Sequence, residues 1–590
     1  MSIDIETYRL KAQEAIEYVF VKEYHNSLGI PMPIVKILLP DDANYSTGQY
    51  YITIDKTWQI HLNFGKLPIS YHEFQNEVKV LTRHEIEHYM CCPFDVITHF
   101  RMLKRIKDVY YKHFSHLGIN IKYACGAISN QAADIIVDTK NYYRHSKETL
   151  KSEIDWIKIG ANISACPRHC KLMFLTKEAI WKEDLGINET DPEFLKIVHQ
   201  LADSFTKNGI EDKSSFLDKV EEYAEIFFKL YVEDQKNPQQ SSQQGSQQQS
   251  GQQGSQQQSG QQGPQQQSGQ QGSQQQSGQQ GSQQQSGQWG VGRPKDGDEH
   301  GNAFVFADPD KVKEAIEVLA EETSVEEFID LLAIAGIIGM SDKQKGVLWF
   351  NVQSANIIPI VEFSNTGNKS SYTYPSVWRI GDPIEELDLM LTYMTSPRLI
   401  PGMTTKKWEY VSNDDNGTES KQMDLLLVVD TSGSMGSAMK ESANMHQAVL
   451  ASYGILSYFE STKSKVAFIG FSDKIDAYVD WSDKYDDVRE RLLTNGHGGT
   501  KFPISRIKST LDVRSRDLVT VLITDGDLGN INESVSYFRD YLNDDNKLYI
   551  FLLVGSKSLH SYEPLKNIGA KIYNANNANE FCDMVLTDME

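Results

Sequence analysis

The chain of 590 residues is too long for one hydrophobic core, and about two to four domains are expected. Its formal net charge of −22 excludes a general nucleic-acid-binding protein, because such proteins replace phosphate counterions with clustered Lys and Arg. No apolar run reaches the roughly 18 residues of a membrane span, and the first residues lack the order of a signal peptide. Six cysteines in so long a chain do not make a disulfide framework, so the sequence indicates a cytoplasmic protein with reduced thiols.

The first 235 residues alternate helical and strand-like patterns, and we expect one domain over 1–235. Apolar residues at helical spacing predict a helix over about 4–24, and a second helix is expected over 71–90. Two strands are expected between these helices, at 50–54 and 58–64. The second strand alternates apolar and polar residues, which is typical of a half-buried strand.

The second helix ends in the motif H-E-x-x-H, formed by His84, Glu85 and His88. Two histidines four residues apart lie on one face of a helix, so both imidazoles can bind the same Zn²⁺. Glu85 then stands beside the fourth coordination position, where it can take the proton of a water that attacks a peptide carbonyl. The motif predicts a zinc endopeptidase; a degenerate site that serves structure or recognition is the alternative.

An acidic pair follows on an expected helix, where Asp134 and Asp138 form D-x-x-x-D. This pattern resembles the E-x-x-x-D helix of thermolysin-like (gluzincin) peptidases. The resemblance implies an α+β zincin-like fold in which Asp134 is the third zinc ligand and Asp138 orients His84. Aspartate stands where glutamate is usual in that family, so Asp138 or another residue stays open as the third ligand.

The residues around the motif suggest two further features of a peptidase site. In zincins the strand before the H-E-x-x-H helix pairs with an extended substrate, so the resemblance places a substrate beside strand 58–64. Tyr142, Tyr143 and His145 follow the acidic pair and are candidates for the group that stabilises the transition state. The sequence does not choose among these three.

The composition changes completely over 236–300. Residues 243–287 hold five copies of the nine-residue unit QQGSQQQSG, with Pro264 in place of Ser in the third copy. A unit without an apolar residue cannot build the core of a solenoid. We interpret 236–300 as a flexible linker with a reach of about 40 Å; self-association through the Gln tract is the alternative.

A mixed helical and β connecting region is expected over 301–421, and a second domain over 422–590. In the second domain, near-continuous apolar strands alternate with helix-length segments. This alternation indicates a parallel sheet covered on both faces, an α/β Rossmann-like fold. The expected strands are 425–430, 465–471, 518–525 and 547–554.

The first of these strands runs into the motif D-x-S-x-S. Two further polar segments follow in order, at 496–500 and 523–526. Their hydroxyl and carboxylate groups are hard oxygen donors suited to Mg²⁺ or Mn²⁺, at the carboxyl ends of expected parallel strands. The three segments resemble von Willebrand factor A (VWA) domains. The resemblance implies a metal-ion-dependent adhesion site whose open position takes a carboxylate from a partner protein. Its implied ligands are Asp430, Ser432, Ser434, Thr500 and Asp525.

The order of the two sites resembles a bacterial architecture, the metallopeptidase and VWA-like family associated with MoxR-type AAA+ ATPases. The resemblance implies a zinc endopeptidase that its VWA domain recruits to a substrate or partner protein, with a MoxR-type ATPase as the implied partner. The alternative is a catalytically inactive adaptor or recognition subunit of such an ATPase complex. No nucleic-acid partner and no membrane partner are expected.

Overall fold

The computed structural model describes most of residues 5–236, 309–355 and 423–574, together with 373–378 and 406–410. The predicted linker over 236–300 lies outside the described residues, apart from Lys236. Within the described residues, no helix is both long and apolar enough to cross a membrane.

The chain divides into two compact units. The N-terminal unit comprises Met1–Leu319 and Leu331–Ile337, and the C-terminal unit comprises Ala320–Asp330 and Ile338–Glu590. Each unit has its own buried apolar cluster. The predicted boundaries at 235, 300 and 421 stay a prediction.

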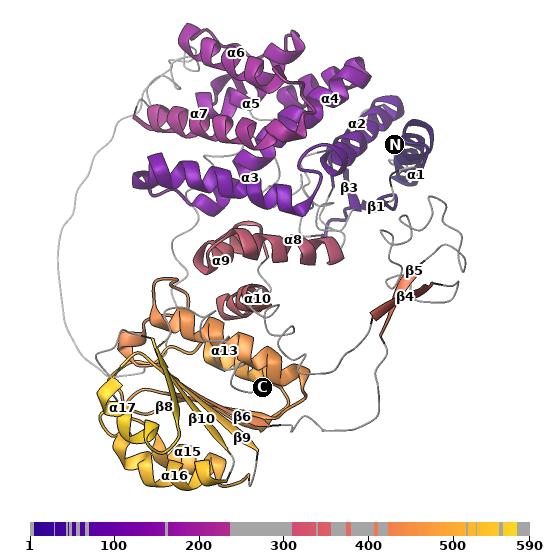
Figure 1. Ribbon diagram of the computed structural model, residues 1–590. Helices are drawn as coiled ribbons and strands as arrows, with labels where there is room; N and C mark the ends of the chain where they lie inside the picture. Colours follow the sequence, from indigo (N-terminus) through magenta and orange to yellow (C-terminus); the bar gives the residue numbers. More distant parts are fainter. Residues whose placement is uncertain are drawn as a thin grey trace, which may run out of the picture. The chain divides into compact units, whose positions relative to one another are not determined.

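The N-terminal unit is mainly helical (Figure 1). The helices predicted over 4–24 and 71–90 are confirmed; the first continues as a π-helical turn, Tyr18–Glu23. The α-helices are α1 (Ile5–Glu17), α2 (Tyr71–Met90), α3 (Val96–Val109), α4 (Ile121–Ile159), α5 (Arg168–Trp181), α6 (Pro192–Thr206) and α7 (Phe216–Lys236). Two further helices, α8 (Pro309–Glu322) and α9 (Val325–Ile334), follow in the chain.

Helix α2 is well specified at its start and along one face. Ser70 caps it, because its Oγ accepts a hydrogen bond from Glu73 N at 3.4 Å and donates one to Glu73 Oε2 at 2.8 Å. Phe74, Val78 and Ile86 are fully buried on the face that packs in the same apolar cluster as α1 and the small sheet. This packing fixes the rotation of α2 about its axis and leaves its other face to the motif histidines.

The small sheet has the order β1-β3-β2, with β1 at Ile34–Ile37, β2 at Tyr50–Ile54 and β3 at Gln59–Phe64. β3 pairs with β1 in parallel and with β2 in antiparallel fashion. The expectation that a substrate pairs with strand 58–64 is therefore wrong, because both edges of β3 are already hydrogen-bonded to neighbouring strands. The alternation expected for this strand also fails at Asn63, which is fully buried.

The C-terminal unit contains a six-stranded mixed sheet of order β11-β10-β9-β6-β7-β8. All four predicted strands are present, but the all-parallel prediction is wrong at one edge. There β8 follows β7 after a short turn and pairs with it in antiparallel fashion. The strands are β6 (Asp424–Asp430), β7 (Val466–Phe471), β8 (Ile475–Ser482), β9 (Leu518–Thr524), β10 (Lys547–Leu552) and β11 (Lys571–Asn574).

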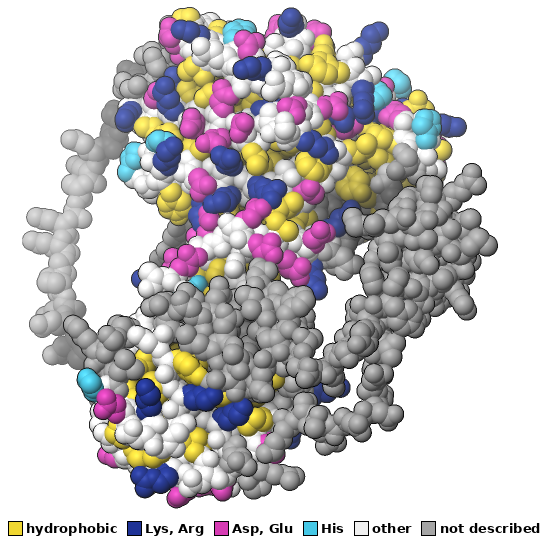
Figure 2. All heavy atoms as spheres, in the orientation of Figure 1, with side chains coloured by type: hydrophobic (Ala, Val, Ile, Leu, Met, Phe, Trp, Pro, Cys, Tyr) yellow, Lys and Arg dark blue, Asp and Glu magenta, His cyan; other side chains and the backbone are white. Residues whose placement is uncertain are grey.

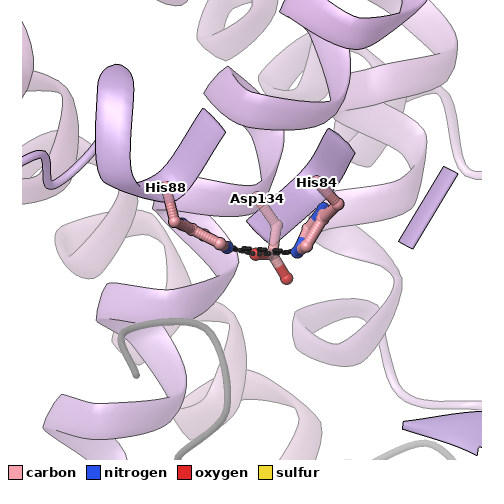
Figure 3. Close-up of side chains that lie close together, drawn as sticks. All are labelled: His84, His88 and Asp134. Atoms are coloured by element: carbon pink, nitrogen blue, oxygen red, sulfur yellow. Dashed lines mark hydrogen bonds and ion pairs between the residues drawn. The ribbon is translucent and has the colours of Figure 1, made fainter. Parts of the chain in front are cut away.

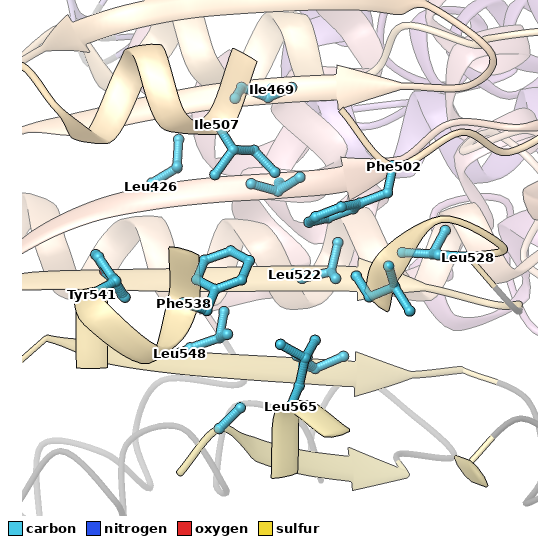
Figure 4. Close-up of a cluster of buried hydrophobic side chains, with 14 of the residues drawn as sticks. Leu426, Ile469, Phe502, Ile507, Leu522, Leu528, Phe538, Tyr541, Leu548 and Leu565 are labelled. Atoms are coloured by element: carbon cyan, nitrogen blue, oxygen red, sulfur yellow. The ribbon is translucent and has the colours of Figure 1, made fainter. Parts of the chain in front are cut away.

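Helices cover both faces of this sheet (Figure 1). Helices α15 (Ile504–Leu511), α16 (Val535–Asn543) and α17 (Leu559–Lys566) contribute to a buried apolar cluster on one face (Figure 4). Helix α13 (Asn444–Ser461) covers the other face, and α14 (Tyr485–Leu492) packs beside β7 and β8. Burial on both faces explains why β6 is apolar along nearly its whole length.

Helix α10 (Asp342–Ala355) packs against α13 although about 90 residues separate them in the chain. The ring of Phe350 lies 5.2 Å from that of His446 and 5.5 Å from that of Tyr453. Trp349 contacts His446 at 5.3 Å and donates a hydrogen bond to Thr323 O. A separate two-stranded ribbon pairs β4 (Thr373–Val377) with β5 (Lys406–Tyr410).

Shortening Leu522 should weaken the C-terminal sheet. This side chain is 2% exposed within the apolar cluster, so Leu522→Ala leaves a cavity and should lower the free energy of unfolding by about 2–5 kcal/mol. Val513→Ala, at a side chain that is 76% exposed, should change it by less than about 0.5 kcal/mol. Urea unfolding followed by circular dichroism measures both, and equal losses would contradict the packing described.

Candidate metal centres

His84 and His88 of α2 and Asp134 of α4 meet inside the N-terminal unit (Figure 3). The two Nε2 atoms lie 3.1 Å apart, and Asp134 Oδ1 lies 3.6 Å from Nε2 of His84 and 3.2 Å from Nε2 of His88. All three residues are at most 8% exposed. Three potential ligand atoms therefore converge on one buried point.

The hydrogen bonds of the two Nδ1 atoms determine whether each Nε2 atom carries a proton or a lone pair. His84 Nδ1 lies 2.6 Å from Asp138 Oδ1, and His88 Nδ1 lies 2.8 Å from the backbone oxygen of Cys92. Both partners accept hydrogen bonds only, so each Nδ1 carries the proton. In the neutral imidazoles both Nε2 atoms then present lone pairs, and these face each other and a carboxylate oxygen. Because two lone pairs and a carboxylate oxygen converge, a cation among them is electrostatically favourable.

The distances suit a tetrahedral metal ion. Zinc–ligand bonds of 2.0–2.1 Å at tetrahedral angles separate the ligand atoms by about 3.3 Å. The three observed separations of 3.1, 3.2 and 3.6 Å lie close to that value. The group can thus hold a metal ion with three protein ligands and one remaining position.

The surrounding charges also favour a cation. Burial disfavours an imidazolium at His84, but Asp138, Asp134 and Glu85 outweigh burial and raise its pKa to about 9. The pKa of Asp134 is lowered, since the two imidazoles overcome the effect of its burial. In the absence of a metal, protons supply the positive charge that these buried carboxylates require.

Asp134 and Asp138 take different places in this group. Asp134 faces the two Nε2 atoms, whereas Asp138 lies on the Nδ1 side of His84. Asn130, one turn earlier on α4, donates a hydrogen bond to Asp134 Oδ2 at 3.0 Å and so orients this carboxylate. No motif marks Asn130 in the sequence; only its spacing of four residues from Asp134 could have suggested the contact.

The two glutamates of the motif have different surroundings. Glu85 is 3% exposed and lies close enough to His84 to raise the pKa of that imidazole. Glu87 is fully buried and binds Lys140 at 2.8 Å, Arg144 at 2.9 Å and the hydroxyl of Tyr24 at 2.9 Å. Glu87 therefore joins α2 to α4, whereas Glu85 is the motif carboxylate beside His84.

The three candidates for the transition-state group have other described partners. The Tyr142 hydroxyl donates to Glu183 Oε1 at 2.8 Å, and its ring stacks on Trp181. Tyr143 is 58% exposed, and His145 Nε2 lies 3.9 Å from Glu23 Oε2. The described contacts of these three side chains do not include the metal-ligand group.

A second polar cluster lies where β6 and β9 end at the same edge of the C-terminal sheet. Ser432 Oγ lies 3.1 Å from Ser434 Oγ, which donates to Asp525 Oδ1 at 3.0 Å. Asp430 Oδ1 accepts a hydrogen bond from Ser432 N at 2.9 Å, and Asp430 Oδ2 accepts one from Thr524 Oγ1 at 2.7 Å. Four of the five residues implied by the VWA resemblance thus form one connected cluster.

The position of this cluster follows from the strand order. β6 is paired in parallel with β7 on one side and with β9 on the other. The strand order therefore reverses at β6, with later strands added on both of its sides. Ligands of open α/β sheets bind at this point, outside the carboxyl ends of the strands.

Thr500 belongs to a loop that packs against the D-x-S-x-S segment. Gly433 N donates to Gly498 O at 3.3 Å, and Gly496 lies directly against Thr431. A Cβ atom on Gly496 would lie 2.5 Å from Thr431 O and 2.3 Å from an Asp476 oxygen, so only glycine fits there. Thr500 itself is half-buried, and no contact joins it to the other four residues in the described structure.

Comparison with known proteins adds no relative to these observations. No protein-family model matches the chain, and no curated protein matches its sequence. Any functional assignment therefore depends on the sequence motifs and on the geometry of the two clusters.

The N-terminal cluster should hold about one tightly bound zinc per chain when the full-length protein is purified in excess Mg²⁺. His84→Ala and Asp134→Ala each remove one of three converging ligands and should leave little zinc. Asp203→Asn, on the exposed face of α6, is the control and should keep it. Elemental analysis measures the content; zinc retained in Asp134→Ala would place the third ligand elsewhere.

Gly496→Ala should disturb the C-terminal cluster. The added methyl group must displace the loop from Thr431, which should destabilise the unit by about 1–3 kcal/mol and weaken Mn²⁺ binding by at least about tenfold. Gly499→Ala is the matched control, because a Cβ there meets no atom within 4 Å. Electron paramagnetic resonance of Mn²⁺ measures the affinity, and equal affinities in the two variants would contradict a contribution of this loop to Mn²⁺ binding.

Proposed function

We propose that this chain is a zinc-dependent endopeptidase with a zincin-like N-terminal domain and a VWA-like C-terminal domain. The observation that supports it most directly is the convergence of Nε2 of His84, Nε2 of His88 and Oδ1 of Asp134, which would leave a tetrahedral ion one open position. Catalytic zinc sites have this composition of three protein ligands and one open position. A structural zinc site has four protein ligands, and no fourth His, Cys, Asp or Glu joins the group in the described residues.

In this proposal each residue has a separate task. When bound, zinc lowers the pKa of a coordinated water and polarises the substrate carbonyl. Glu85, buried next to His84, accepts a proton from the attacking water and passes it to the leaving amine. His84, His88 and Asp134 bind the ion, and Asp138 keeps the proton of His84 on Nδ1.

The C-terminal unit supplies recognition in this proposal. Asp430, Ser432, Ser434 and Asp525 bind Mg²⁺ or Mn²⁺, and an acidic side chain of a partner protein completes the coordination. The partner that the family resemblance implies is a MoxR-type AAA+ ATPase. We place the protein in a reducing compartment, the cytoplasm, because the described cysteines form no disulfide bond with one another.

One observation favours a second candidate, a catalytically inactive adaptor. The three ligands and Glu85 are between 0% and 8% exposed, which leaves little surface for a peptide to reach them. In that case the metal stabilises a domain that only recognises a partner. The two candidates differ in what they require of Glu85.

The Glu85→Gln variant should distinguish the endopeptidase from the inactive adaptor. The amide keeps the size of the side chain but cannot accept the proton, so cleavage of a protein substrate should fall by a factor of about 10²–10⁴. Zinc content and melting temperature should stay close to those of the wild type, because Glu85 does not belong to the ligand group. Cleavage is measured by mass spectrometry of a casein or peptide-library digest.

Two results would contradict the peptidase. One is cleavage unchanged in Glu85→Gln, which would assign the activity to a contaminant or to another site. The other is a zinc-loaded wild type that cleaves nothing in the library with the VWA-type site saturated by Mg²⁺, which would favour the adaptor.

A further inference from the structure

A chain of buried charged groups extends from His84 away from the metal-ligand group. Asp138 Oδ1 lies 2.6 Å from His84 Nδ1, and its other oxygen accepts a hydrogen bond from Lys177 Nζ at 2.9 Å. Lys177 Nζ also lies 2.5 Å from Glu153 Oε1. The three helices α2, α4 and α5 are thereby linked through one ammonium group.

We propose that Lys177 is a positioning residue for metal binding, which acts through Asp138 to hold the His84 imidazole with Nε2 toward the ion. The inference rests on the proposed metal site and goes beyond it, because no sequence motif includes Lys177. A carboxylate that binds only a histidine can rotate about its side-chain torsions. One that is bound at both oxygens, to His84 and to Lys177, has a single orientation.

Lys177 is buried together with the two carboxylates that it binds. Its side chain is 2% exposed, with Nζ 5.3 Å above the ring of Phe174. A lysine is almost never buried to this degree without anionic partners, because the loss of hydration is costly. Asp138 and Glu153 are both within direct reach, so Lys177 balances the second aspartate that the His84 site brings into the interior.

Lys177 also fixes the shape of α4. Asp138 and Glu153 are 15 residues apart on this helix, a separation of about 22 Å if it were straight. Both nevertheless bind the same nitrogen atom, so the helix must bend sharply between them. His145 provides the bend with non-helical angles of φ −136° and ψ 49°. Lys177 joins the two halves of α4, the first of which carries Asp134 and Asp138.

If Lys177 had only a structural role, the loss of another buried ion pair on α5 should weaken zinc binding equally. Helix α5 offers a matched control for this case. Lys171 lies on the same helix, is 8% exposed and forms its own ion pair with Glu189 at 2.8 Å. This pair has no described contact with the metal-ligand group. Lys171→Met therefore removes a comparable buried pair without touching Asp138.

The test uses the full-length protein and zinc alone as the probe, titrated against a chelator in excess Mg²⁺. Lys177→Met should weaken zinc binding by about 10- to 100-fold, and Lys171→Met should change it less than about twofold. In an Asp138→Asn background, Lys177→Met should cause little further loss, because Lys177 acts through that carboxylate. Lys177→Arg keeps the charge and should restore part of the affinity.

Equal zinc affinity in wild type and Lys177→Met would overturn the inference, as would equal losses in the Lys177 and Lys171 variants. A full further loss in the Asp138→Asn background would also overturn it. If Lys177→Met does not fold, the double variant Lys177→Met/Glu153→Gln, which leaves one unpaired buried carboxylate fewer, is measured in the same way, and wild-type affinity there has the same meaning. A wild type that binds no zinc would instead refute the proposed function.

Discussion

The proton on Nδ1 of each motif histidine is the constraint on which the N-terminal unit depends. Asp138 holds that proton on His84, and the backbone oxygen of Cys92 holds it on His88. When both imidazoles are neutral, their Nε2 atoms must then direct lone pairs at each other and at Asp134. Neighbouring like partial charges repel, so the arrangement is stable only when positive charge, from protons or a metal ion, lies among them. The packing of α2 and the bend of α4 bring these groups together.

The elements of this site could be predicted from the sequence better than its geometry. Helix α2 and the acidic helix follow from the spacing of their residues, and the strands of the C-terminal sheet follow from their apolar runs. The choice between Asp134 and Asp138 could not be made, because residues four apart lie on the same helix face and only the distance to α2 separates them. Lys177 was missed because a buried lysine has no sequence signature.

The errors in strand pairing have two physical causes. A strand pattern reports which faces are buried but not which edges are occupied, so nothing in residues 58–64 shows that β3 is central in its sheet. β8 escaped prediction because, as a half-exposed edge strand, it has the mixed composition of a loop. β8 pairs with the strand directly before it in the chain, so here its mixed composition, and not a distant partner, concealed the pairing.

The packing of α10 on α13 has a consequence for any attempt to isolate the C-terminal sheet. Trp349 and Phe350 cover His446 and Tyr453, all of which are buried. A fragment that starts at residue 422 would lose this cover and present an aromatic surface to solvent. The shortest autonomous folding unit around the sheet therefore begins before Asp342, and recombinant fragments cut later are candidates for aggregation or spurious binding.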